Sequence, residues 1–147
     1  MKIIRANEKK KILQQLNEQF GITKLPYLLL RFGKEKIRAF SGSLSSEELN
    51  TLDKSIRIEN TGVYLLKEQK DGLRLSLDAL SLLQGQITKN ILQLTDKQAA
   101  DWFKGHDLII EKDRNFKILE NKGEFIGCGK STGEKITNFV PKERRVK

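Results

Sequence analysis

The sequence has very few of the residues from which disulfides, metal sites and nucleophilic centres are built. Its 147 residues include one cysteine, Cys128, and one histidine, His106. A single cysteine cannot form an intramolecular disulfide, and these two residues cannot supply the four ligands of a structural zinc site. His106 stands beside Asp107, but no activated serine or second acid accompanies them as a catalytic pair would require. We therefore expect no enzymatic activity, no metal and no cofactor.

Long apolar runs are missing as well. No stretch approaches the roughly 18 apolar residues of a membrane span, and none follows a basic start as in a signal peptide. We expect a cytoplasmic protein. With 37% hydrophobic residues, the chain is long enough for one ordinary domain or for two small domains that share a modest core.

The net charge of +9 is concentrated in three short segments. Residues 1–11, 24–38 and 125–147 each hold four more cations than carboxylates, whereas the remaining segments are slightly acidic. Clustered cations bind a polyanion mainly by releasing its condensed counterions. This segregation favours nucleic-acid binding over a merely solvated lysine-rich surface. The lysines at positions 9–11 are either a second RNA contact or the solvent face of a helix.

The segment GEFIGCGKST, residues 123–132, ends in the letters of a phosphate-binding P-loop. That motif requires a glycine five positions before Gly129, and the residue there is Glu124. It also requires a helix that begins at the Lys-Ser pair, whereas Gly133 follows at once. We predict no nucleotide site, and we expect Cys128 to pack as a small apolar residue.

The first ninety residues mix helices with short strands in hairpins. Asn7 as N-cap and Gly21 as the stop predict an amphipathic helix between them. Gly33 and the sequence KDG at 70–72 each predict a hairpin turn. Shorter helices are expected in residues 45–52 and from Asp78 to the break at Gly85. This mixture is typical of an α+β fold.

The chain after residue 88 has a different pattern. It contains one helix, with Thr95 as N-cap and Gly105 as its C-terminal stop, and we expect Trp102 or Phe103 at its end to pack in a core. Short strands are predicted for DLIIE, FKILE, EFIGCGK, KITNFV and the tail. So many short strands favour a small closed barrel or sandwich. The predicted domains are residues 1–88 and residues 89–147, packed directly on each other.

The order of these C-terminal elements resembles a PUA domain, a small RNA-binding β-barrel. The likeness rests on a strand, the helix TDKQAADWFKG, the strands HDLIIE and GEFIGCGKS, and the closing ITNFVPKERRV. The closing piece is similar to the C-terminal PUA segment of archaeal RNA cytosine-methyltransferases of the Nop/Sun type. The upstream GLRLSLDALSLL is similar to the pre-PUA domain of small ribosome-biogenesis proteins. The resemblance implies an α+β protein with a pre-PUA-like domain before a PUA-like β-barrel.

The resemblance also implies where RNA is contacted, since PUA domains use the helix, the glycine-ended loop after it and the last strand. The candidate RNA-binding residues are Lys104, Gly105, His106, Lys130, Lys142, Arg144 and Arg145. The glycines around Cys128 then allow close backbone approach and do not cradle phosphate. If the tail is extended, Lys142 and Arg144 face one side and Glu143 and Arg145 the other.

The expected function is therefore non-catalytic binding of structured RNA, ribosomal or transfer RNA, in ribosome biogenesis or RNA modification. RNA helices are recognised mainly by shape, phosphates and 2′-hydroxyls, which suits lysine and arginine. The alternative is a protein-interaction adaptor that docks on an RNA-modifying enzyme or a ribosomal protein.

Overall fold

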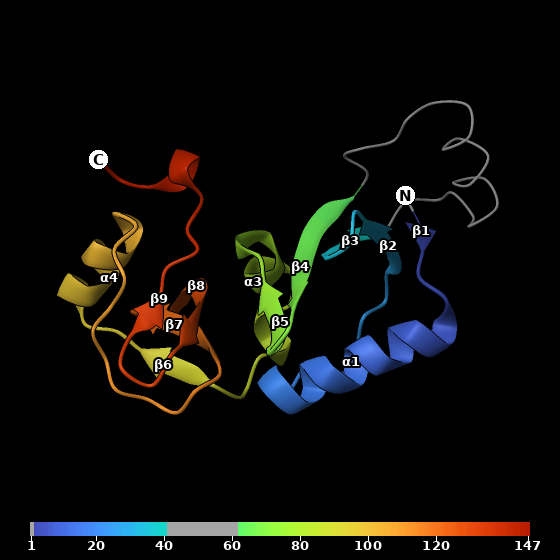
Figure 1. Ribbon diagram of the computed structural model, residues 1–147, viewed down its shortest axis with the longest axis horizontal. Coiled ribbons are helices and arrows are strands. Elements are labelled where there is room, and N and C mark those ends of the chain that lie inside the picture. Colours follow the sequence, from blue (N-terminus) through green and yellow to red (C-terminus); the bar gives the residue numbers. More distant parts are fainter. Residues whose placement is uncertain (1, 41–61) are drawn as a thin grey trace.

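The computed structural model describes residues 2–40 and 62–147, and two sheets lie side by side in it (Figure 1). The helix expected at residues 45–52 lies outside the described residues. The N-terminal half is α+β, as predicted. Within the described residues, no helix has both the length and the apolar character needed to cross a membrane.

The N-terminal sheet is an antiparallel meander of five strands in chain order. Helix α1 (Ala6–Phe20) and helix α3 (Leu77–Leu82) accompany it, and the short 3₁₀ helix η1 (Gln84–Gln86) follows α3. The two predicted hairpin turns are confirmed, since β2 pairs with β3 and β4 pairs with β5. The strands are β1 (Lys2–Ile3), β2 (Leu28–Phe32), β3 (Lys36–Phe40), β4 (Val63–Gln69) and β5 (Gly72–Leu75).

Helix α1 buries the apolar stripe Ile12, Leu16 and Phe20, and it ends at Gly21 in the left-handed conformation, as the sequence predicts. Its start was predicted wrongly. Arg5 is the N-cap, and Asn7 lies inside the first turn. The reason is that the N–H of Ile4 donates to the Leu29 carbonyl at 2.9 Å, so the chain leaves the sheet directly into the helix. Likewise α3 begins at Leu77, one residue before Asp78, because the Ser76 hydroxyl caps it.

The C-terminal sheet has four strands in the order β6-β7-β8-β9, and helix α4 (Asp96–Phe103) connects its first two strands. The β6–β7 pair is parallel and the others are antiparallel. The predicted N-cap of α4 is confirmed, because Thr95 and Gln98 form a reciprocal capping box. The strands are β6 (Ile91–Gln93), β7 (Phe116–Asn121), β8 (Glu124–Ser131) and β9 (Ile136–Thr137).

Two of the predicted C-terminal strands were wrong. Residues 107–111 contribute only an isolated bridge between Leu108 and Ile136, and the tail forms the 3₁₀ helix η2 (Lys142–Arg144). The tail cannot extend the ladder because its backbone bonds elsewhere: the N–H of Val146 donates to the Phe103 carbonyl at 2.7 Å. The sheet is therefore a curled half-barrel, and the described residues do not close it.

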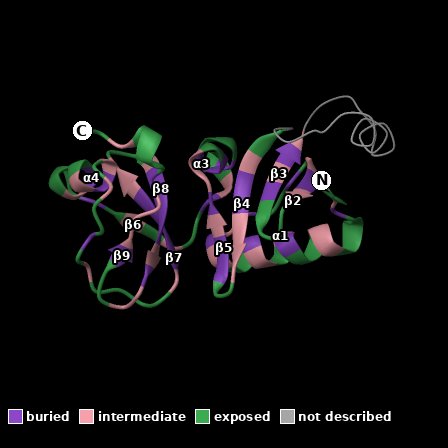
Figure 2. Ribbon diagram, turned by 45° about the horizontal axis from the view of Figure 1, so that its top comes forward, coloured by how far each residue is buried: buried purple, intermediate pink, exposed green. Residues whose placement is uncertain are grey.

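The two halves share one hydrophobic cluster. This first cluster contains the buried residues of the N-terminal sheet and of α1, and it also takes in Phe116, Ile118 and Cys128 from β7 and β8. A second cluster lies inside the half-barrel around Trp102, which is fully buried, with Leu119 and Ile136. Figure 2 shows buried residues along the strands of both sheets. Direct packing of the halves is therefore confirmed, and so is a core position for Trp102.

Strand β8 lies between these two clusters. Cys128 faces the first cluster, whereas Gly127 and Gly129 face the indole of Trp102. A Cβ atom built on Gly127 would lie 2.5 Å from Trp102 Nε1, and one on Gly129 would lie 2.5 Å from Ile136 Cγ2 and 2.8 Å from Trp102 Cη2. Both glycines therefore allow the close approach that the sequence predicted for them.

Substitution of Gly129 tests this packing. We expect Gly129→Ala to lower the free energy of unfolding by about 1–3 kcal/mol, because a methyl group there overpacks the half-barrel. Gly85→Ala is the matched control, since a Cβ there meets nothing within 4 Å. Urea denaturation of both variants measures the difference, and equal stabilities would contradict the packing.

Candidate nucleic-acid interface

The C-terminal tail packs on the end of α4. Gly105, which follows the helix, has a left-handed φ of 90°, and a Cβ there would lie 2.5 Å from Arg145 Nε. Arg145 therefore lies directly over Gly105, and its Nε donates to the Val140 carbonyl at 3.0 Å. Two segments forty residues apart in the sequence thus form one surface.

Hydrogen bonds of Asn138 and Asp107 hold the tail against the loop that follows α4. The Asn138 amide donates to the carbonyls of Trp102 and His106, each at 2.8 Å. In return, the Asn138 backbone N–H donates to Asp107 at 2.8 Å. This N–H lowers the pKa of the Asp107 carboxyl against the opposing effect of partial burial, and the Lys135 ammonium, 3.2 Å away, adds to the lowering. Asp107 is thus engaged in holding the tail and is not paired with His106.

Most of the residues predicted from the sequence come together here. Lys104 and His106 are exposed beside Gly105, Arg145 covers that glycine, and Lys142 is exposed on the adjoining turn η2. We call Lys104, Gly105, His106, Lys142 and Arg145 the tail–loop surface. It combines a glycine-ended loop with cations from two segments.

Lys130 and Arg144 lie apart from this surface. Lys130 contacts Asp71 in the turn between β4 and β5, and this ion pair lowers the pKa of the Asp71 carboxyl. Arg144 turns toward the N-terminal half, where its Nη2 lies 3.5 Å from Asp78. The alternation predicted for an extended tail is wrong, because a 3₁₀ helix has three residues per turn and puts Glu143 and Arg144 on the wall of one pocket.

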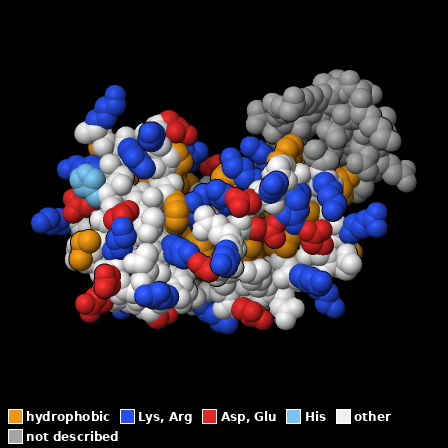
Figure 3. Space-filling view, viewed as in Figure 1, with side chains coloured by type: hydrophobic (Ala, Val, Ile, Leu, Met, Phe, Trp, Pro, Cys, Tyr) orange, Lys and Arg blue, Asp and Glu red, His pale blue; other side chains and the backbone are white. Residues whose placement is uncertain are grey.

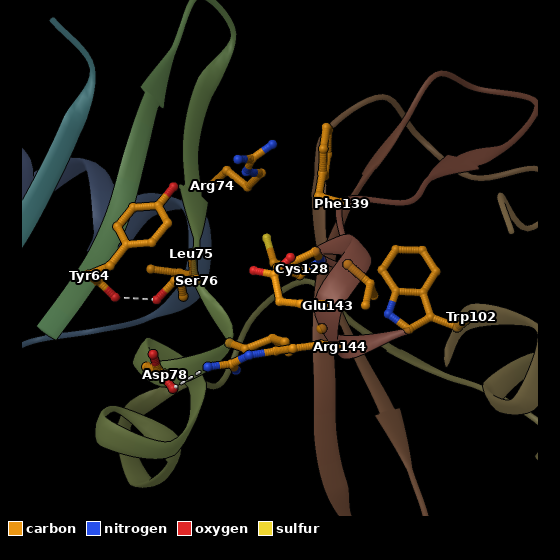
Figure 4. Close-up of a pocket in the computed structure, with 14 residues that line it drawn as sticks. Tyr64, Arg74, Leu75, Ser76, Asp78, Trp102, Cys128, Phe139, Glu143 and Arg144 are labelled. Atoms are coloured by element: carbon orange, nitrogen blue, oxygen red, sulfur yellow. Dashed lines mark hydrogen bonds and ion pairs between the residues drawn. The ribbon is translucent and has the colours of Figure 1, made fainter. Parts of the chain in front are cut away.

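This pocket lies between the two halves and has a volume of about 210 Å³ (Figure 4). One wall comes from β4, β5 and the start of α3, and the other from β8 and the segment that leads into η2. We call it the junction pocket. Tyr64, Arg74 and Phe139 in its walls were missed by the sequence analysis, because nothing in their local patterns shows that they meet across the two halves.

The basic clusters are partly neutralised within the fold. Arg31 contacts both Glu8 and Glu68, and the Lys9 ammonium donates to the Tyr27 carbonyl at 2.6 Å. Figure 3 shows lysine and arginine side chains on both halves of the molecule and at their junction. The charge of the first two clusters is therefore less available to a ligand than the sequence suggests.

The single cysteine lies in the core and is not exposed at either surface. Burial raises the pKa of the Cys128 thiol to about 12, so the nucleophilic thiolate is disfavoured, and the residue packs in the core as predicted. Within residues 2–40 and 62–147, no three His, Cys, Asp or Glu side chains are grouped to hold a metal ion. The described side chains at the tail–loop surface and the junction pocket are cations, aromatic rings and hydrogen-bonding groups.

Comparison with known families agrees with this geometry. Residues 89–146 match the family described as the methyltransferase RsmF PUA domain. They form a PUA domain of the RsmF type. The PUA domain thus comprises the half-barrel, α4 and the tail, and the resemblance predicted from the sequence is confirmed. A pre-PUA type for the N-terminal half stays a prediction.

Relatives of the PUA domain extend into the N-terminal half. The chain is 26% identical over 132 residues to ribosomal RNA small subunit methyltransferase F of Psychromonas ingrahamii, covering 85% of this chain and 26% of that protein. It is 27% identical over 134 residues to the protein of the same name in Vibrio cholerae, an alignment that covers 90% of this chain and 27% of that protein. It is 32% identical over 103 residues to the protein of that name in Photobacterium profundum, and this alignment covers 65% of this chain and 20% of that protein. The chain thus spans about a quarter of the length of these relatives.

The pH dependence of stability tests how Asp107 holds the tail. Because the folded-state pKa of Asp107 is lowered, its stabilisation is present above the ordinary value of 3.8 and is lost as the pH falls through the folded pKa. We expect Asp107→Ala to lower the free energy of unfolding at pH 7 by about 1 kcal/mol. The deficit shrinks below pH 4 in urea denaturation. Glu111→Ala, at an exposed carboxylate nearby, is the control, and a pH-independent deficit would contradict the account.

Proposed function

We propose that this chain is a non-catalytic RNA-binding unit that recognises structured ribosomal or transfer RNA in ribosome biogenesis or RNA modification. The observation that carries the proposal is the tail–loop surface of the PUA domain, where Arg145 packs over Gly105 beside the exposed Lys104 and His106. The similarity to ribosomal RNA small subunit methyltransferases supports ribosomal RNA as the ligand.

The chemistry of the tail–loop surface suits an RNA backbone. Lys104 and Lys142 are exposed ammonium groups, each able to neutralise a phosphate. Gly105 carries no side chain, which leaves the space that the Arg145 side chain occupies at the end of α4. Arg145, in contrast, donates a hydrogen bond to the Val140 carbonyl and packs on Gly105. We therefore assign Arg145 mainly to shaping the surface, and Lys104 and Lys142 to phosphate contact.

Lys130 and Arg144 lie outside the tail–loop surface and have a different role. Both are engaged by carboxylates of the N-terminal half, Asp71 and Asp78 respectively. Each pair is solvent-exposed, so it contributes little to stability, and a phosphate can compete for the cation. We propose that they extend the RNA contact toward the junction of the two halves.

Replacing the two exposed lysines tests the surface. We expect the Lys104→Ala/Lys142→Ala double variant to bind ribosomal RNA more weakly, and the slope of log affinity against log salt to fall by about one for each lysine removed. Filter binding over a range of salt concentrations measures both.

The matched control is Lys97→Ala/Lys122→Ala, which removes two exposed lysines at the opposite end of α4. An effect equal to that of Lys104→Ala/Lys142→Ala would show nonspecific electrostatics and contradict the assigned surface. If the wild-type chain holds bulk tRNA and rRNA on the filter only weakly at physiological salt, the result supports the alternative of a protein-interaction adaptor.

A further inference from the structure

The junction pocket has a composition that the tail–loop surface does not share. Tyr64 of β4 lies on one side and Phe139 on the other, and Arg74 of β5 extends between them (Figure 4). The Arg74 guanidinium carbon lies 4.2 Å from the centre of the Phe139 ring, so the two groups are stacked. A guanidinium stacked on one side still offers its second flat face. The pocket therefore presents planar surfaces suited to a planar ligand.

The floor of the pocket contains a hydrogen-bond donor without an acceptor. Trp102 is fully buried, and its indole nitrogen has no hydrogen-bond partner within the described part of the chain. In Figure 4 this nitrogen points toward the pocket from the barrel side. Gly127 lies beside it, and a side chain there would collide with the indole. This N–H is enclosed at the pocket floor, so its environment changes when the packing around the pocket changes.

The size of the pocket restricts the ligand. A cavity of about 150 Å³ accepts one benzene ring, whereas pockets for drug-sized ligands begin near roughly 300 Å³. The junction pocket, at about 210 Å³, lies between these values. It accommodates a single heterocyclic ring and excludes a whole nucleotide, so a ribose and its phosphate would remain at the mouth.

The polar groups around the mouth favour a base over an aromatic side chain. The Arg144 guanidinium is a hydrogen-bond donor at the mouth, and the carboxylates of Asp78 and Glu143 are hydrogen-bond acceptors. A nucleobase carries carbonyl acceptors and amino donors in the plane of its ring, so it can satisfy both kinds of group while its faces stack. Phenylalanine has neither, and tyrosine has one hydroxyl.

We propose that the junction pocket captures one unstacked base of a single-stranded RNA segment. The base stacks on Arg74 and Tyr64, and its polar edge meets Arg144, Asp78 and Glu143 at the mouth. This inference rests on the proposed RNA binding, and it adds a preference for RNA with an unpaired nucleotide beside the helical part. It also gives the N-terminal half a direct role, since Tyr64 and Arg74 both belong to that half.

The single tryptophan makes the pocket directly observable. Trp102 is the only tryptophan in the sequence, so ¹⁵N-labelled protein gives one indole N–H resonance. The probes are a single-stranded RNA hexanucleotide, a fully paired RNA duplex, and a strand of the same length in which every nucleotide is abasic. We expect the single strand to shift the indole resonance, and the duplex and the abasic strand to bind with a much smaller shift.

Variants of the wall provide the second readout. Tyr64→Ala should weaken single-strand binding about tenfold, the usual loss for one stacked base, and leave duplex affinity unchanged. Tyr64→Phe keeps the ring and should bind as the wild type does. Arg74→Lys, which loses the planar face but keeps the charge, provides the same test if Tyr64→Ala does not fold. Phe32→Ala is the control, because Phe32 stacks with Arg38 outside the pocket.

The outcomes separate this inference from the proposed function. If single-stranded RNA binds but neither the indole resonance nor the wall variants respond, the base pocket is overturned and RNA binding stands. If no RNA binds, both fail. If an aromatic peptide shifts the indole resonance and RNA does not, the pocket belongs to a protein partner and the inference is overturned.

Discussion

The contact between Trp102 and the glycines of β8 is the interaction on which the rest of the structure depends. Because Gly127 and Gly129 carry no side chains, a large indole can fill the half-barrel, and its position fixes the end of α4. The opposite face of the same strand, through Cys128, belongs to the core shared with the N-terminal half. One strand thus packs on both sides: the half-barrel has its own cluster around Trp102, and the larger cluster is shared by the two halves.

The candidate RNA-binding features follow from this arrangement. Because Trp102 anchors the end of α4, the loop at Gly105 is fixed where the tail can fold back over it, and Asn138 and Asp107 hold the tail there. Because β8 packs against the N-terminal sheet, Phe139 and Arg74 meet across the junction. A positively charged surface and a pocket for a planar group are thus built from the same few contacts.

The sequence predicted the local elements well where the signals are short-range. The N-cap at Thr95, the stop at Gly21 and the hairpin turns all depend on neighbouring residues, whereas the close approach at Gly127 and Gly129 was implied by the family resemblance. It failed where a long-range partner decides the conformation. The tail looks like a strand by alternation, but the N–H groups of Arg144 and Arg145 bond within the tail and that of Val146 donates to Phe103 at the end of α4. The junction pocket was unpredictable for the same reason, because its walls come from segments up to eighty residues apart.

The central claim is that RNA lies along the tail–loop surface and reaches into the junction pocket. Ultraviolet crosslinking of the whole chain to ribosomal RNA, followed by mass spectrometry of the modified peptides, tests it most directly. The account predicts crosslinks in residues 102–106 and 138–145 and at Tyr64. Crosslinks confined to the outer face of α1 and to the β2–β3 hairpin would contradict it.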